Sequence, residues 1–105
     1  DPSDQGIAHR VQAMTLQALG QPEGAEQTMQ RSLELLTQAR NRYELGRTYF
    51  ELGRIQRARG ALEEARDSVE KALAIFRRLG ARHDASLASK ALVALQSAAS
   101  GSSNP

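Results

Sequence analysis

Residues 49–73, which read YFELGRIQRARGALEEARDSVEKAL, decide the fold of this chain. Apolar residues recur there every three or four positions, the spacing of one face of an α-helix. Gly60 interrupts the pattern, and glycine readily adopts the positive φ with which helices commonly end. The stretch therefore predicts two helices separated by a turn at Gly60.

The pattern extends outward because the chain repeats itself with a period of 40 residues. Shifting the sequence by that distance pairs identical residues at small or apolar positions: Gly6/Gly46, Ala18/Ala58, Gly20/Gly60, Ala25/Ala65, Leu33/Leu73 and Leu52/Leu92. Packing constrains such positions most strongly. Gly20 and Gly80 separate further apolar stripes and suit turns as Gly60 does.

We expect one repeat domain over residues 1–99, followed by a short tail. The predicted helices cover about residues 5–19, 22–39, 42–59, 61–79 and 83–99. The predicted units are repeat one at 5–40, repeat two at 42–80, a closing helix at 83–99 and a disordered tail at 100–105. Pro22 suits a first helical turn, and Asn41 and Asp84 are expected to cap the helices that follow them.

Composition excludes several classes of protein. The chain has 105 residues, of which 40% are hydrophobic and 25% charged, as in a globular domain. It has no cysteine, so disulfides and thiolate metal sites are excluded. A net charge of +2 is too small to indicate nucleic acid or a membrane surface, and no apolar run could cross a membrane. The chain begins Asp-Pro-Ser without a signal-peptide pattern, so we expect a cytoplasmic piece of a longer protein.

The stretch quoted first resembles a tetratricopeptide repeat (TPR). The residues that match that family's pattern are Tyr49, Leu52, Gly53, Gly60, Ala65, Val69, Ala72 and Leu73. The period of 40 residues exceeds the ~34 of an ordinary TPR. Arg77 replaces the family's proline, and Gln56 replaces a tyrosine. The chain therefore resembles the longer variant found in multidomain bacterial signalling and regulatory proteins. HEAT and armadillo repeats have similar periods but fit the spacing less well.

The resemblance implies an all-α, right-handed superhelix of two helical hairpins and one closing helix, which binds a protein or peptide. The helices of a hairpin would cross closely, so Gly53, Ala65 and Ala72 must be small. The first helix of each hairpin would line a concave groove with Arg10, Met14, Gln17, Arg47, Phe50, Arg54, Arg57, Leu87, Lys90 and Ala94. Because the charged members of this set are all cations, we expect an acidic partner.

Two other functions are open. The closing helix has little polar face, which predicts a homodimer formed through Leu87, Leu92 and Leu95. Alternatively, an anionic small molecule or nucleic acid would bind the cations of the groove, which are Arg47, Arg54, Arg57 and Lys90.

No pattern in the sequence indicates chemistry. Neither His9 nor His83 has further ligands at metal-binding spacing, and no catalytic triad or phosphate-binding glycine loop is present. We expect neither an enzyme nor a bound cofactor or metal.

Overall fold

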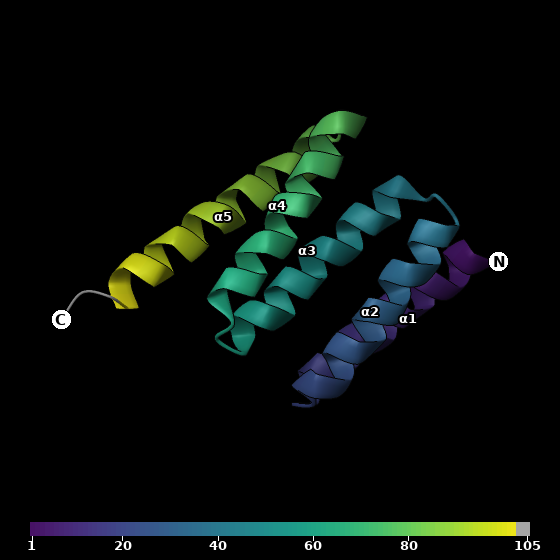
Figure 1. Ribbon diagram of the computed structural model, residues 1–105, viewed down its shortest axis with the longest axis horizontal. Coiled ribbons are helices and arrows are strands. Elements are labelled where there is room, and N and C mark those ends of the chain that lie inside the picture. Colours follow the sequence, from purple (N-terminus) through teal and green to yellow (C-terminus); the bar gives the residue numbers. More distant parts are fainter. Residues whose placement is uncertain (103–105) are drawn as a thin grey trace.

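The computed structural model describes residues 1–102, which form five α-helices (Figure 1). The helices are α1 (Pro2–Ala18), α2 (Pro22–Gln38), α3 (Arg42–Ala58), α4 (Leu62–Leu79) and α5 (Arg82–Ser102). The all-α prediction is confirmed. The tail prediction is wrong for residues 100–102, which continue α5. Residues 103–105 lie outside the described part of the chain.

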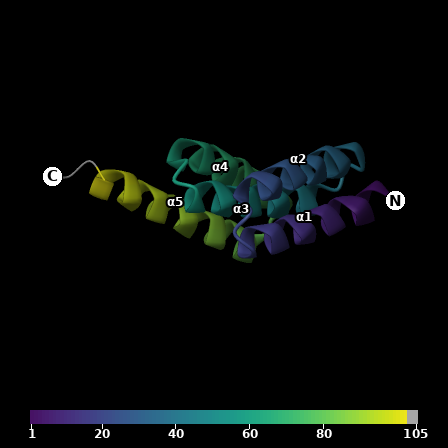
Figure 2. The same ribbon diagram turned by 90° about the horizontal axis from the view of Figure 1, so that it is seen from below.

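The helices stack in two layers. The pairs α1–α2 and α3–α4 form antiparallel hairpins, and α5 packs on α4. Figure 2 shows α2 and α4 in one layer and α1, α3 and α5 in the other. The shortest dimension of the molecule is 17 Å. That thickness suits two helical layers whose axes lie about 8–10 Å apart.

All four connections between helices use the same turn. Gly20, Gly60 and Gly80 adopt φ values of 76°, 84° and 70°, as the sequence predicts for turn residues. In each turn the next residue donates its backbone N–H to a carbonyl five residues earlier, as from Gln21 to Leu16 at 2.9 Å. This pattern is the Schellman motif, and it satisfies carbonyls at the helix end that would otherwise lack a partner. At the remaining turn, Arg40 occupies the left-handed position with φ 57°.

Replacing Arg40 by glycine is expected to raise the free energy of unfolding by about 1 kcal/mol. A left-handed conformation strains a residue that carries a Cβ by about 1–2 kcal/mol, and the greater freedom of glycine in the unfolded chain offsets part of the gain. Urea unfolding followed by circular dichroism measures the change. Lys90→Gly is the control, because Lys90 lies in the interior of α5 and its replacement should destabilise.

Two hydrophobic clusters hold the hairpins together. One joins α1, α2 and α3 around Ala13, Met29 and Leu52, and the other joins α3, α4 and α5 around Phe76. A Cβ built on Gly53 would lie 2.6 Å from Cγ2 of Val69, so α3 and α4 cross as closely as expected. Ala65 and Ala72, the other two residues expected to be small for this crossing, are fully buried.

Two of the three expected features at helix starts are confirmed. Pro22 is the first residue of α2, and the Asn41 side chain accepts a hydrogen bond from the Glu44 backbone N–H at 3.3 Å. The prediction for Asp84 is wrong, because α5 already begins at Arg82. The Asp84 carboxylate instead accepts a hydrogen bond from Tyr43 on α3.

Candidate binding face

Two clefts open between the helices of the α1, α3 and α5 layer. The α3–α5 cleft encloses about 220 Å³ and is lined by Arg47, Phe50, Glu51, Arg54, Phe76, Asp84 and Leu87. The α1–α3 cleft encloses about 290 Å³ and is lined by Met14, Gln17, Ala18, Glu51, Arg54, Ile55 and Ala58. Both have apolar side chains among their lining residues, which is the usual make-up of a peptide-binding groove.

The two clefts share one wall. Glu51 and Arg54 on α3 line both of them, and their side chains form an ion pair at 3.6 Å. Arg54 is 67% exposed, so solvent screens this pair strongly. A ligand that spans both clefts would therefore cross α3 at Arg54.

The charge of this face differs from the prediction. Arg47 and Arg54 line the α3–α5 cleft together with Glu51 and Asp84, so its formal charges cancel. Arg47 also pairs with Glu44 at 3.4 Å. The expectation of a groove with cations alone is therefore wrong, and with it the electrostatic reason for an acidic ligand at this site.

The structure brings most of the predicted groove residues together. Met14 and Gln17 line the α1–α3 cleft, whereas Arg47, Phe50, Arg54 and Leu87 line the α3–α5 cleft. The other four, Arg10, Arg57, Lys90 and Ala94, line neither cleft. Whether the face binds a partner stays a prediction.

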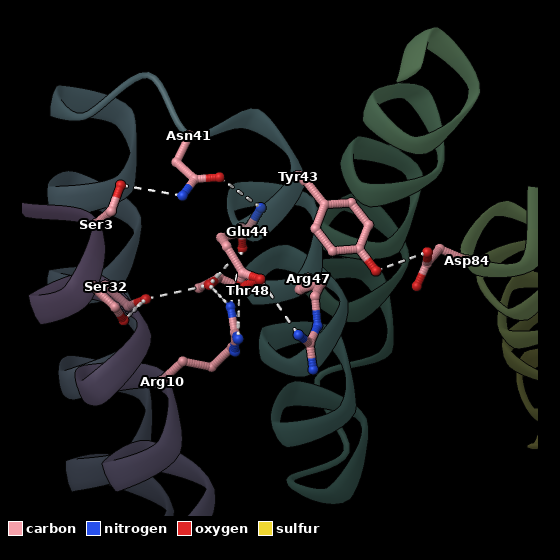
Figure 3. A network of polar contacts seen from close by, with 10 residues as sticks. Ser3, Arg10, Ser32, Asn41, Tyr43, Glu44, Arg47, Thr48 and Asp84 are labelled. Atoms are coloured by element: carbon pink, nitrogen blue, oxygen red, sulfur yellow. Dashed lines mark hydrogen bonds and ion pairs between the residues drawn. The ribbon is translucent and has the colours of Figure 1, made fainter. Parts of the chain in front are cut away.

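Arg10 does not lie in the groove, and this part of the prediction is wrong. Its side chain is only 4% exposed and forms an ion pair with Glu44 at 2.8 Å (Figure 3). It also donates hydrogen bonds to the Thr48 hydroxyl at 3.3 Å and to the Glu44 carbonyl at 3.2 Å. Burial between α1 and α3 makes this guanidinium a link between hairpins and removes it from the binding face.

The polar contacts around Arg10 continue into α2. Ser32 donates its hydroxyl to the Gly6 carbonyl at 2.6 Å, and its oxygen lies 3.2 Å from that of Thr48 (Figure 3). These contacts join the first hairpin to α3. Forty residues later, Arg10, Ser32 and Thr48 have the apolar counterparts Phe50, Ala72 and Ala88. Phe50 is half-buried and also lines the α3–α5 cleft, so the repeat alone did not indicate that Arg10 is buried.

Tyr43 connects α3 to α5 and to α4. Its hydroxyl donates a hydrogen bond to Asp84 Oδ2 at 3.0 Å, and its ring packs at 6.1 Å from that of Phe76. The hydrogen bond to Asp84 is the main cause that raises the Tyr43 pKa above its ordinary value; burial and the Asp84 charge add to it, and Arg47 opposes it. Tyr43 therefore keeps its proton at neutral pH, so this contact persists under ordinary conditions.

Six lining residues belong to no predicted groove position: Glu51, Phe76 and Asp84 in the α3–α5 cleft, and Ala18, Ile55 and Ala58 in the α1–α3 cleft. Glu51 lies three residues before Arg54, and that helical ion-pair spacing could have indicated it. Asp84 lies forty residues after Glu44, so the repeat placed an acid there. Phe76 belongs to α4, and the sequence offers no sign that its ring reaches the other layer.

The residues predicted for self-association are not all accessible. Leu95 is only 4% exposed and belongs to the cluster between α4 and α5, and half-buried Leu92 packs against the same cluster. Leu87 is 42% exposed. The predicted apolar strip is therefore wrong at Leu95, because the side of α5 that carries it faces α4. Self-association itself stays a prediction.

A family model described as tetratricopeptide repeat matches residues 4–78. A comparison with curated proteins finds no match. Among the described residues, no helix is both long and apolar enough to cross a membrane, and no three His, Asp or Glu side chains gather as a metal site.

Proposed function

Because the chain belongs to the tetratricopeptide repeat family, we propose that it is a protein-interaction module that holds a peptide or helix of a partner in the α1–α3 and α3–α5 clefts. Repeats of this family generally mediate protein–protein interaction. The 40-residue period is a reason to expect the longer variant of the repeat and a part in signalling or regulation.

The observation that carries the proposal is the pair of clefts with a shared wall. Each offers one large, exposed apolar side chain, Met14 at 41% and Leu87 at 42%. Burial of such side chains supplies most of the affinity of a peptide complex, while charged groups mainly fix its register. A partner with two apolar anchors and charges of both signs fits this face better than an acidic one.

Peptides selected from a random display library against the intact chain test the proposal. Leu87→Ala is expected to weaken the binding of selected peptides about tenfold, because it removes an apolar contact of about 1.4 kcal/mol. Titration calorimetry measures the dissociation constants.

Leu79→Ala is the matched control. The exposed fraction of Leu79 is 44%, similar to the 42% of Leu87, but Leu79 lines neither of the two clefts. Equal loss of affinity in the two variants would place binding elsewhere and contradict the proposal.

A further inference from the structure

One edge of the stack carries most of the unpaired positive charge. At this edge α2 turns into α3 and α4 turns into α5 (Figure 1). The chain has 14 Lys and Arg residues. Seven of them form ion pairs among the described residues: Arg10, Arg31, Arg47, Arg54, Arg59, Arg66 and Lys71. Five of the other seven lie at this edge and are exposed, which we call the arginine edge: Arg40, Arg42, Arg77, Arg78 and Arg82.

The acids nearest to these arginines along the chain are already engaged. Glu44 pairs with Arg10 and Arg47, and Asp84 accepts the hydrogen bond of Tyr43. Asp1 and Asp4 also lie at this edge, because α1 begins beside Asn41, which donates a hydrogen bond to Ser3. Neither acid forms an ion pair with the arginine edge, so no carboxylate of the described chain lies within ion-pair distance of its guanidinium groups.

Two of these arginines, Arg42 and Arg82, lie where a positive charge does not stabilise the fold. Arg42 and Arg82 are the first residues of α3 and α5. The dipole of a helix is positive at its N-terminus, so a cation there is unfavourable. The two residues lie 40 positions apart and so occupy the same place in successive repeats. By contrast, Arg77 and Arg78 lie in the last turn of α4, where cations are favourable.

The edge also carries two equivalent clefts. One encloses about 340 Å³ and is lined by Leu36, Thr37, Arg40, Arg42 and Leu45. The other encloses about 210 Å³ and is lined by Phe76, Arg77, Gly80, Ala81, Arg82 and Ala85. The pairs Leu36/Phe76, Arg42/Arg82 and Leu45/Ala85 are each 40 positions apart. Each cleft thus combines apolar lining residues with an arginine at the start of a helix, and the repeat sets their spacing.

We propose that the arginine edge is a second interaction surface, which binds an acidic segment of a partner protein with apolar side chains between its carboxylates. Guanidinium groups bind carboxylates in bidentate geometry, and the apolar lining residues of the clefts accept aliphatic side chains. Phosphates of a nucleic acid or of lipid headgroups would use the arginines but not these apolar residues. The clefts of the arginine edge share only the buried Phe76 with the α3–α5 cleft and no residue with the α1–α3 cleft, and their arginines line neither of those two clefts, so the inference goes beyond the proposed function.

A fluorescein-labelled peptide of glutamate, aspartate and leucine tests the proposal by fluorescence anisotropy. The double variant Arg42→Glu/Arg82→Glu is expected to bind it at least about tenfold more weakly, because two attractive contacts become repulsive. Glutamate is favourable at a helix N-terminus, so this variant should fold, and circular dichroism verifies that it does.

The double variant Arg57→Glu/Lys90→Glu is the matched control. It changes the net charge equally, and Arg57 and Lys90 are the two remaining cations that form no ion pair in the described chain. The proposal expects its affinity, and that of Leu87→Ala, to stay close to that of the unchanged protein. The affinity of Leu87→Ala therefore distinguishes peptide binding at the arginine edge from peptide binding at the α1–α3 and α3–α5 clefts.

Three results would overturn the proposal. If both double variants bound the peptide equally weakly, the peptide would be attracted by the net charge of the protein alone. If a peptide without leucine bound as tightly as the leucine-containing peptide, the apolar lining residues would not contribute to binding. Tighter binding of single-stranded DNA or of phosphatidylserine vesicles, lost in Arg42→Glu/Arg82→Glu, would assign the edge to nucleic acid or to membranes.

Discussion

Replacing Phe76 by alanine is expected to lower the free energy of unfolding by about 3–5 kcal/mol. Phe76 is 2% exposed and among the largest fully buried side chains of the chain. It lies in the cluster that joins α3, α4 and α5, so its removal leaves a cavity that three helices border. A domain of this size is typically stable by about 5–15 kcal/mol, so the variant would lose a large part of its stability.

Urea unfolding followed by circular dichroism measures this loss, and Phe76→Leu is the companion variant. Leucine keeps most of the apolar volume, so its cost should stay below about 1.5 kcal/mol and the variant should remain folded. Similar costs for both substitutions would contradict the view that Phe76 acts by filling space.

A double-mutant cycle of Gly46→Ala and Phe76→Leu tests whether the missing side chain of Gly46 leaves the space that the Phe76 ring fills. A Cβ built on Gly46 would lie 2.8 Å from Cε1 of Phe76. Gly46→Ala alone should therefore cost about 1–3 kcal/mol through overpacking. In the Phe76→Leu background the ring atoms are absent, so the cost should fall, although a Cβ on Gly46 would still lie 3.1 Å from Cγ2 of Ile75. Equal costs in both backgrounds would show that the two positions do not couple.

Replacing Arg10 by methionine is expected to lower the free energy of unfolding by about 3 kcal/mol. The substitution leaves the Glu44 carboxylate, 14% exposed, without its partner at 2.8 Å. Arg47 still contacts Glu44 at 3.4 Å, which keeps the cost at the lower end for a broken buried pair. Thr48 also loses a hydrogen bond from Arg10. Chemical unfolding measures the effect.

Arg31→Met is the matched control. Arg31 pairs with Glu34 at 2.9 Å, but the two side chains are 56% and 67% exposed. Water screens such a pair, so its loss should cost less than about 1 kcal/mol. If both methionine variants lost the same stability, burial would not be the reason that Arg10 matters. Adding Glu44→Leu to Arg10→Met should recover part of the loss, because no charge is then left buried alone.

Local features of the sequence predict the helices and most of the turns. Periodic apolar residues and glycines every 20 or 40 positions identify where each helix lies, because a helix and its Schellman turn depend on residues a few positions apart. Arg40 shows the limit of such rules. It takes a left-handed conformation at the second of the four evenly spaced turns although it is not a glycine.

The candidate binding face was predicted only in part. Met14, Phe50, Arg54 and Leu87 line the clefts as expected, because the repeat assigns them to the same helix face. Arg57 follows Arg54 by three residues, yet it lines neither cleft. Which of two neighbouring arginines borders a cleft depends on how far α3 is rotated about its own axis.

The sequence by itself determined that this chain is a stack of helical hairpins, because periodicity and turn residues act over a few positions. Only the tertiary structure decided which charges are free. Arg10 meets Glu44 across 34 positions, and Tyr43 meets Asp84 across 41. Leu95 turns toward α4 and not toward solvent. Such contacts follow from the rotation and spacing of packed helices, which the whole core sets together and no short segment encodes.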